Sequence, residues 1–371
     1  MLPHIVLTWC ATARGGAERS VPEVAGELAA AGLPVTVVWW RFGDGPGYAG
    51  AEGVTAVEVD DHRAYAAAVR AALDAGGAAI VSSHRTMLSD LRIAPAHVPV
   101  IAVVRGVLAP TQAFRVVDPD TGTLAEYTPR TLPWDVLAPG VAAWVRISEA
   151  SAQSIRSVAP GGAPVVAIYN GVSVPVWRPA PWSERAAVRF VVVGRSVPWK
   201  RLDAVLEAVD GMRSPERVRL DVYGAPGSQQ PELDRMAAGS RASVSFRGWV
   251  GDLPRHIAGA HALVSASASE GFGRGILDAA GVAVPAIVPA SGAGPELVLH
   301  GLTGFTYDPG DPAALVRVLD EVAAMDPAAL AQLGWAARSR AIGRFSPARC
   351  ADEYLVLCHR LIAERALVGA R

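Results

Sequence analysis

Residues 269–278 read Ser-Glu-Gly-Phe-Gly-Arg-Gly-Ile-Leu-Asp, and this stretch decides the fold. It sets two carboxylates, Glu270 and Asp278, eight residues apart around a Gly-x-Gly turn that opens a predicted helix. Gly271 and Gly273 allow backbone N–H groups to approach an anion closely, and the positive end of the helix adds about half an elementary charge of attraction. The pattern predicts a phosphate-binding turn; the alternative is a junction of loop and helix with two solvated acids.

A second stretch, residues 190–201, adds positive charge. It reads Phe-Val-Val-Val-Gly-Arg-Ser-Val-Pro-Trp-Lys-Arg, which predicts a buried strand, a turn at Gly194 and the start of a helix. Arg195 offers a planar fork of donors, whereas Lys200 offers a compact charge. Together with a helix N-terminus, these two cations are suited to a diphosphate.

Two further turns belong to the same half of the chain. Phe-Arg-Gly-Trp-Val at 246–250 follows a short predicted strand and places an aromatic ring beside a glycine, so we expect Trp249 and Val250 to contact a nucleobase. Ser-Gly-Ala-Gly-Pro-Glu at 291–296 is another glycine-rich turn, with its proline placed for the first position of a helix.

In this order and spacing, these stretches resemble the retaining GT-B glycosyltransferases of family GT4, and the likeness covers most of the chain. The resemblance implies that Glu270 and Asp278 stand in the family's Glu-x7-Glu pattern, with the second acid shortened to Asp. It also implies that Arg195 and Lys200 bind the donor diphosphate. The donor site implied in the second half comprises Gly194, Arg195, Lys200, Trp249, Val250, Glu270, Gly271, Phe272, Gly273, Arg274 and Asp278.

The first half carries shorter matches to the same family. Gly15 and Gly16, in Arg-Gly-Gly-Ala-Glu-Arg at 14–19, match its N-terminal Gly-Gly turn and are expected to approach the donor. Ser148-Glu149 matches a Ser-Glu at a strand end, and Asn170-Gly171-Val172 matches an interdomain Asn-Gly-Val. Acceptor-binding residues are expected at the strand ends of this half, namely Arg14, Trp40, His84, Arg105 and Ser148.

Composition limits the classes of function. The chain has 371 residues, of which 51% are hydrophobic and 19% charged, so it has enough apolar residues for the cores of two globular domains. A net charge of −1 and a pI near 6.7 argue against nucleic acid as a partner, because binding a phosphate backbone needs a basic face. Small molecules are the expected partners, and the sequence does not decide whether the protein forms a homodimer. The excess of Ala, Gly, Val and Arg over Lys is typical of a GC-rich genome, consistent with an actinobacterial type of the family.

The sequence also predicts a cytoplasmic protein. Its N-terminus lacks the basic region of a signal peptide, and no apolar run reaches about 18 residues without Pro, Gly or charge, so no transmembrane segment is expected. The three cysteines, Cys10, Cys350 and Cys358, have no paired or metal-like spacing, which predicts reduced thiols.

Short apolar runs alternate with helix-length segments, and this pattern restarts in the second half. It predicts an α/β protein with two Rossmann-like, doubly wound parallel sheets that face each other across a cleft, the GT-B arrangement. Strands are expected at 3–9, 34–40, 78–82, 98–104, 142–147, 164–168, 189–194, 218–223, 243–246, 261–266, 285–288 and 304–306. Helices are expected at 16–32, 62–75, 129–138, 149–158, 201–211, 230–238, 252–259, 273–283 and 312–324.

These elements divide the chain into domains. Residues 1–170 are expected to form an acceptor-binding domain and residues 171–345 a nucleotide-sugar-binding domain, with a Pro-rich linker near 174–182. Residues 346–371 are expected to form a C-terminal helix that returns to the first domain. Residues 106–133 lack clear periodicity, which is more typical of a lid or binding loop than of a passive connector.

Several features of the first half have two interpretations. Asp118-Pro119-Asp120 resembles the metal-binding Asp-x-Asp of GT-A enzymes, but the repeated unit and the turn chemistry of Asp-Pro-Asp-Thr-Gly favour a plain turn, so no metal is expected. His84 follows a strand and either lines the sugar or acceptor site or is a satisfied structural histidine. Trp40 falls at the end of a predicted strand. It either packs in the core or lines an acceptor pocket that holds a ring or an amine.

The predicted activity is transfer of a sugar, of the hexosyl type, from a UDP-, GDP- or other nucleoside diphosphate sugar to a small polar acceptor with retained anomeric configuration. Arg195, Lys200 and the backbone N–H groups from Phe272 to Arg274 would stabilise the leaving diphosphate without a metal or other cofactor. Glu270 would orient the sugar, Asp278 would hold the ribose, and His84 is a further catalytic candidate.

The acceptor is the least constrained part of this prediction. A natural-product (antibiotic) intermediate or glycoconjugate precursor, such as an aminocyclitol or another amine, is favoured over a lipid or cell-envelope acceptor. The rival activity is a sugar-nucleotide epimerase or hydrolase of the same fold, which would need no acceptor.

Overall fold

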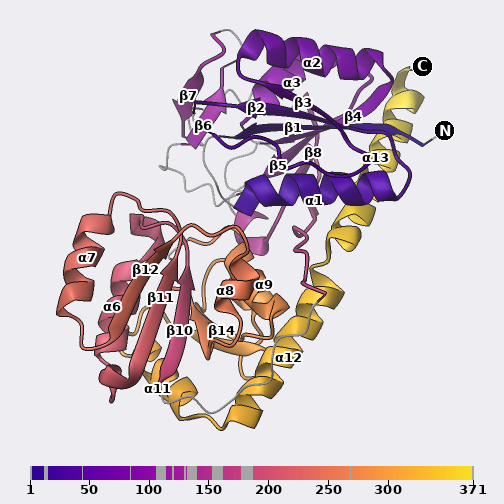
Figure 1. Ribbon diagram of the computed structural model, residues 1–371. Coiled ribbons are helices and arrows are strands. Elements are labelled where there is room, and N and C mark those ends of the chain that lie inside the picture. The colour runs from indigo at the N-terminus through magenta and orange to yellow at the C-terminus, as the bar shows by residue number, and fades with distance from the viewer. Residues whose placement is uncertain are drawn as a thin grey trace. The chain divides into compact units, whose positions relative to one another are not determined.

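The chain forms two compact units in this computed structural model (Figure 1). The first unit comprises residues 1–171 and 347–371, and the second comprises residues 172–346. The sequence placed the boundary after residue 170, one residue before this division. The structure describes residues 2–11, 16–43, 45–83, 85–105, 114–118, 121–128, 131, 140–152, 162–176, 187–267 and 269–369.

The first unit contains a parallel sheet of seven strands in the order β3-β2-β1-β4-β5-β8-β9. Its β-branched runs are buried on both faces, as parallel sheets require. The strand order reverses between β1 and β4, and ligands of doubly wound sheets bind at the carboxyl edge beside such a reversal. The strands are β1 (His4–Ala11), β2 (Val35–Arg41), β3 (Thr55–Val59), β4 (Gly77–Ser83), β5 (Val100–Val104), β8 (Val141–Arg146) and β9 (Val165–Ala167).

Helices cover both faces of this sheet, with α2 and α3 on one face and α1 and α13 on the other (Figure 1). One core joins Val6 and Cys10 of β1 to Trp40 of β2 and to Tyr65 and Val69 of α2. Asp61 caps α2 by accepting a hydrogen bond of 2.8 Å from the N–H of Ala64. The helices are α1 (Gly16–Ala30), α2 (His62–Asp74), α3 (Met87–Ile93) and α13 (Pro347–Gly369).

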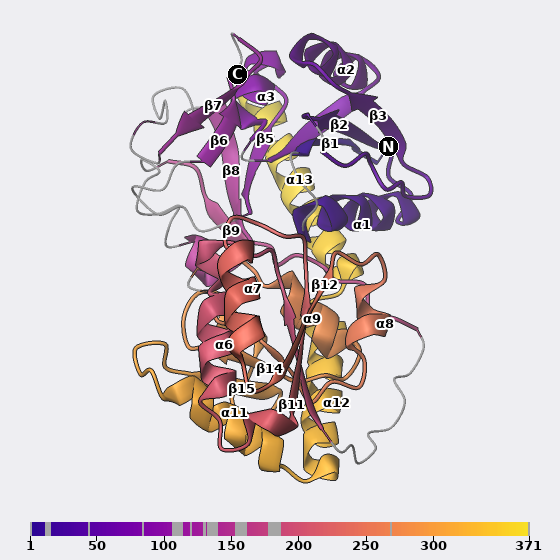
Figure 2. The same cartoon turned by 60° about the vertical axis from the view of Figure 1, so that its left-hand side comes forward.

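The second unit contains a parallel sheet of six strands in the order β12-β11-β10-β13-β14-β15. Figure 2 shows α6 and α7 on one side of this sheet and α8 and α9 on the other. One core of this unit packs β10 and β11 against α6 and α11. The strands are β10 (Val188–Val193), β11 (Val218–Tyr223), β12 (Ser243–Gly248), β13 (Ala262–Val264), β14 (Ala286–Pro289) and β15 (Gly304–Tyr307).

The helices of the second unit connect these strands in the alternating order typical of α/β folds. They include two short 3-10 helices, η1 (Pro198–Lys200) and η2 (Pro215–Arg217). The α-helices are α6 (Leu202–Asp210), α7 (Gln230–Gly239), α8 (Leu253–Ile257), α9 (Arg274–Gly281), α10 (Gly294–Leu297), α11 (Ala314–Ala324) and α12 (Pro327–Arg344).

The predicted α/β class with two parallel sheets is confirmed, and every predicted strand occurs within about three residues of its expected bounds. The expectation of an irregular segment over 106–133 is wrong for its described part, because β6 (Phe114–Val117) and β7 (Leu124–Tyr127) pair as an antiparallel two-stranded sheet. The helix expected at 129–138 lies almost wholly outside the described residues, as does most of the one expected at 149–158. The helix start expected at the proline of 291–296 occurs in α10 (Gly294–Leu297), whereas β3, α3, η2 (Pro215–Arg217) and α12 were not predicted.

Within the described residues, none of the helices combines the length and the apolar composition that crossing a bilayer would need.

Helix α12 packs so closely on the second unit that one position admits only glycine. A Cβ atom at Gly334 would overlap the carbonyl oxygen of Ala283, which itself has a left-handed backbone with φ of 56°. Gly343, on the same helix, has no atom within 4 Å of the corresponding Cβ position. The two glycines therefore differ in packing although they share one helix.

We expect Gly334→Ala to lower the stability of the second unit by about 1–3 kcal/mol, because α12 must shift outward to admit the methyl group. Gly343→Ala is the matched control and should raise stability by up to about 1 kcal/mol, since alanine favours the helix. Urea unfolding of the full chain, followed by far-UV circular dichroism, measures both. Equal effects of the two substitutions would show that the close approach of α12 is wrong.

Candidate functional site

Three strand ends of the second sheet meet through glycines at its carboxyl edge. The N–H of Gly194, after β10, donates to the carbonyl of Tyr223 at 2.8 Å, and the N–H of Gly224, after β11, donates to Gly248 at 2.9 Å. A Cβ atom at Gly224 would overlap the carbonyl oxygen of Gly194. Because glycine has no side chain, the backbone at these three positions can approach a ligand closely.

Lys200 is brought to this edge by the turn that follows Gly194. The 3-10 helix η1 ends at Arg201, whose left-handed backbone (φ 49°) reverses the chain into α6. Such non-glycine conformations cost energy and cluster at functional sites. The stem of Lys200 lies against Gly194, with the Cδ atom 3.3 Å from where a Cβ of residue 194 would stand.

The ammonium of Lys200 forms an ion pair with Glu270. Lys200 Nζ lies 2.5 Å from Glu270 Oε2, and the two side chains are 26% and 20% exposed. An ammonium has three donors, so one bond to a carboxylate leaves capacity for a second anionic partner. Two residues that the sequence assigned to one donor site are thus in direct contact.

The turn that carries Glu270 has a backbone that depends on glycine. Gly273 adopts φ of 90° at the start of α9, and a Cβ atom there would meet the side chains of Ile276 and Leu297 at 2.8 and 3.0 Å. The carbonyl of Glu270 accepts from the N–H of Ala293 at 3.2 Å, which packs the glycine-rich turn 291–294 against it.

The remaining side chains expected at the donor site differ in exposure. Gly271, Phe272, Arg274 and Asp278 are buried around the start of α9. The guanidinium of Arg195 is exposed and lies 5.8 Å from the ring centre of Trp199, a cation–π pair that sequence reasoning did not assign. Trp249 and Val250 follow β12, and Trp249 is 52% exposed.

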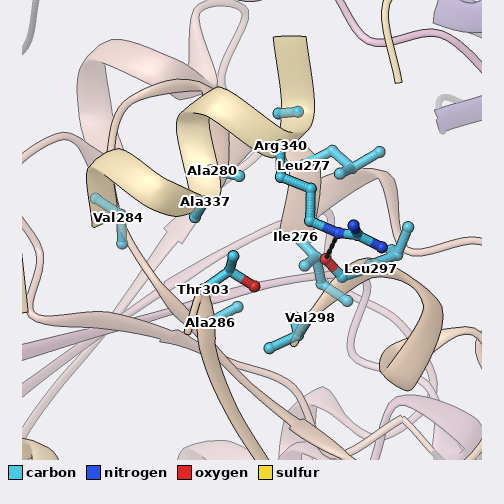
Figure 3. Close-up of a pocket in the computed structure, with 11 residues that line it drawn as sticks. Ile276, Leu277, Ala280, Val284, Ala286, Leu297, Val298, Thr303, Ala337 and Arg340 are labelled. Atoms are coloured by element: carbon cyan, nitrogen blue, oxygen red, sulfur yellow. Dashed lines mark hydrogen bonds between the residues drawn. The ribbon is translucent and has the colours of Figure 1, made fainter. Parts of the chain in front are cut away.

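A layer of side chains supports this turn from behind. The ring of Phe272 meets that of Phe345 edge-on at 6.2 Å, and Arg340 lies over Phe345 at 5.6 Å. Arg340 also donates to the carbonyl of Leu297 at 3.3 Å, as Figure 3 shows. The small pocket in that figure is lined mainly by apolar groups of α9, α12 and β14, so it is a gap in the packing behind the site rather than a place for a charged donor.

Other cations of the second unit are bound to a buried acid. Asp221 of β11 is completely buried and accepts from Arg189 at 2.8 Å and from Arg247 at 2.9 Å, with Arg219 also in contact. Burial opposes its ionisation, but these arginines hold the pKa of Asp221 below its usual range. The cluster stabilises strands β10 to β12, and sequence analysis did not identify it.

The first unit places one expected acceptor residue at its carboxyl edge. Arg105 directly follows β5, donates to Asn170 Oδ1 at 2.9 Å and lies over the ring of Trp9 at 5.4 Å. Arg14, Gly15 and His84 lie outside the described residues, whereas Gly16 begins α1.

Two other residues that were expected to bind the acceptor are buried inside this unit. The expectation for Trp40 is wrong, because its ring is 1% exposed and packs on Tyr65 and Phe42 in the core. Ser148 is buried as well, and its hydroxyl accepts from the N–H of Ser151 at 3.0 Å, as a helix cap does. Trp9 and Trp39 are also buried, so none of these three rings forms an open aromatic pocket.

A buried carboxyl that the sequence analysis missed organises the strand ends beside β4. Asp90 of α3 is fully buried and accepts from Thr8 at 2.6 Å, from Ser82 at 2.5 Å and from the hydroxyl of Tyr65. Ser82 and Thr86 are close to Asp90 in the sequence as well as in space, and this local group would have been the signal. Among the residues that the structure describes, no group of three or more His, Cys, Asp or Glu is placed to hold a metal ion.

Comparison with known proteins agrees with this geometry. Residues 187–324, which contain the Lys200 and Glu270 pair, match the family described as "Glycosyl transferases group 1". Among solved structures, the chain is similar to the Anabaena protein HepE in complex with UDP and glucose, with a TM-score of 0.76 and 17% identity over 96% of this chain and 100% of that one. It is also similar to sucrose-phosphate synthase from Thermosynechococcus elongatus, with a TM-score of 0.77 and 17% identity over 98% and 100%. The fold is that of the GT-B glycosyltransferases.

Curated relatives match part of the chain. The D-inositol 3-phosphate glycosyltransferase of Streptomyces avermitilis is 32% identical over 216 residues, which cover 52% of this chain and 46% of the relative. The protein of the same name from Streptomyces scabiei is 33% identical over 199 residues, covering 48% and 44%. The chain spans a little under half the length of these relatives.

The buried Asp90 predicts a pH dependence of stability. Burial raises the pKa of Asp90 above its ordinary value of 3.8, although the surrounding hydroxyls oppose the shift. As pH rises past 3.8, the unfolded chain releases this proton before the folded chain does, so the contribution of Asp90 to stability falls and then levels off above the folded pKa. Asp90→Asn cannot titrate, so the difference in unfolding free energy between wild type and this variant should decrease with rising pH.

Urea titrations at a series of pH values above 4 measure this difference. Asp352→Asn, at an exposed carboxylate of the same unit, is the matched control. A difference that stays constant across the series for Asp90→Asn would mean that the carboxyl is not desolvated in the folded chain.

Proposed function

We propose that this protein is a retaining glycosyltransferase that moves a sugar from a nucleoside diphosphate sugar to a small polar acceptor. The observation that carries the proposal is the ion pair of Lys200 with Glu270 beside the glycine turn at the start of α9. It joins a cation suited to the leaving diphosphate and a carboxylate suited to sugar hydroxyls at one strand edge.

The comparisons support the nucleotide and the size of the acceptor. HepE of Anabaena, which shares this fold, was solved with UDP and with UDP-glucose. The curated relatives from Streptomyces are named for D-inositol 3-phosphate, a small polar molecule. We therefore favour a uridine nucleotide as donor and a polyol-like acceptor, in a natural-product or glycoconjugate pathway.

The proposed chemistry depends on charge that develops as the glycosidic bond breaks. Negative charge grows on the diphosphate, where the exposed fork of Arg195, the ammonium of Lys200 and the N–H groups of the turn from Phe272 to Arg274 would receive it. No metal or other cofactor is needed in this scheme, since these groups supply the positive field.

The same turn would orient the sugar. Glu270 is fixed at both its backbone and its side chain, so its second carboxylate oxygen can accept from a sugar hydroxyl while the first stays on Lys200. A leaving phosphate oxygen would take the proton of the acceptor hydroxyl as it attacks on the face that the phosphate departs from, which retains the configuration. Asp278 lies about one turn into α9 and would hold the ribose.

We expect Lys200→Ala and Arg195→Ala each to lower kcat for transfer on the order of a hundredfold, because each removes a charge opposite the leaving group. Arg235→Ala, which removes an exposed arginine of the same unit, should leave the rate unchanged. Release of UDP from UDP-glucose, with and without acceptor, follows the reaction. Normal turnover by either site variant would contradict the diphosphate assignment.

Binding of the donor is tested separately by thermal unfolding. At 100 times its dissociation constant, UDP should stabilise the chain by about 2.7 kcal/mol, whereas ADP and dTDP should have smaller effects. If no nucleoside diphosphate raises the unfolding temperature, the proposed function fails. Steady release of UDP without any acceptor would instead favour the hydrolase or epimerase.

A further inference from the structure

Arg105 carries a positive charge that has no acidic partner in contact among the described residues of the first unit. Its recorded partners are the neutral amide of Asn170 and the ring of Trp9, and it forms no ion pair with any Asp or Glu among the residues that the structure describes. The side chain is half-buried, and its Nε atom is fully shielded without a hydrogen-bond partner. A desolvated cation with no counter-ion is unfavourable by itself, so the site favours an anion.

Two more polar hydrogens near Arg105 lack an acceptor. The indole N–H of Trp9, whose ring lies under the guanidinium, is buried and unpaired, and so is the hydroxyl of Tyr354 on α13. Burial raises the pKa of Tyr354 well above its usual range, against the opposing charge of Arg105, so this hydroxyl keeps its proton at neutral pH. Since buried donors in folded proteins nearly always find acceptors, this group of donors indicates a ligand rich in oxygen acceptors.

The position of Arg105 in the sheet also indicates a ligand. Arg105 follows β5 and reaches Trp9 on β1, so it extends past the end of β4, which lies between them in the sheet. The strand order reverses between β1 and β4, and doubly wound sheets bind ligands beside such a reversal. Arg105 is therefore at the expected ligand edge of the first unit rather than on a random surface.

We propose that Arg105, held by Asn170 and Trp9, forms a subsite for an oxyanion of the acceptor, a phosphate or a carboxylate. The planar guanidinium matches the two oxygens of such a group, and the subsite would select anionic over neutral acceptors. An amine-bearing acceptor would meet a like charge here, and the ring face of Trp9 that it would need is already covered by Arg105. This inference rests on the proposed function, because it assigns the acceptor of that reaction.

Binding of inorganic phosphate to the full chain tests the subsite. Because phosphate can also bind at the donor turn, the titration is done by calorimetry in two backgrounds, with saturating UDP and in the Arg195→Ala/Lys200→Ala double variant. We expect Arg105→Gln to weaken phosphate binding about tenfold or more in both backgrounds, since a charge-assisted hydrogen bond is lost. Arg70→Gln, which removes an exposed arginine of α2, should leave it unchanged.

Further arms keep the result decisive. Arg105→Lys preserves the charge but not the fork, so it should bind phosphate with an affinity between those of wild type and Arg105→Gln, and it also tests the subsite if Arg105→Gln fails to fold. A parallel titration with malonate distinguishes a phosphate subsite from a carboxylate subsite. The proposal is supported if wild type binds phosphate or malonate more tightly than the Arg105 variants do. Phosphate and malonate binding that is absent in wild type, or equal in wild type and both Arg105 variants, overturns it.

The donor arm separates this inference from the proposed function. If Arg105→Gln still binds UDP and still releases it from UDP-glucose, the donor site is intact and any loss concerns the acceptor alone. If wild type binds no nucleotide, the proposed function fails, while the double-variant titration still reports whether Arg105 binds an oxyanion.

Discussion

The ion pair of Lys200 with Glu270 is the constraint on which the candidate site depends. It joins two turns that are seventy residues apart in the chain, one after β10 and one before α9. Each partner is placed by glycine, since Gly194 makes room for the lysine stem and only glycine fits the backbone at Gly273. The pair is partly shielded from water, where opposite charges attract more strongly than at the surface. The two turns are therefore fixed relative to each other before any ligand binds.

The rigidity of this pair comes from the layer behind it. Arg340 of α12 donates to the carbonyls of Glu296 and Leu297 and lies over Phe345, which in turn meets Phe272 in the glycine turn. One arginine thus ties the glycine turn that carries Phe272 and the segment after the turn 291–294 to α12. Precise placement of charged groups needs such support, because a shift of about 1 Å is enough to lose most of a catalytic effect.

The sequence predicted those parts of the structure whose cause is local. Strands such as β10 are continuous runs of apolar and β-branched residues, and Gly273 marks a turn whose left-handed backbone favours glycine, so both could be predicted from neighbouring residues. Elements with a weak local pattern were missed: β3 alternates weakly and is an edge strand, and α12 is rich in alanine and glycine without a clear apolar stripe. Partnerships between distant residues were only partly predictable. The resemblance grouped Lys200 with Glu270, but the contacts of Asp90 with Thr8 and Tyr65 could not be predicted, because these residues lie far from it in the chain. The sequence left open whether Trp40 is buried, because burial follows from which strand lies at the centre of the sheet.

The two units treat charge at their ligand edges in different ways. In the second unit, Lys200 already has a carboxylate partner, so in the proposed function a diphosphate would share the ammonium with Glu270, and binding of the donor would be coupled to the position of the acid that would orient its sugar. In the first unit, Arg105 has a neutral amide and a ring as partners, and it forms no ion pair with an acid among the described residues. A shared ammonium favours exchange of partners as the leaving group forms, whereas an uncompensated guanidinium favours selective binding of an anion. In the proposed function, the difference between a catalytic cation and a selective one therefore follows from where each unit places its counter-ions.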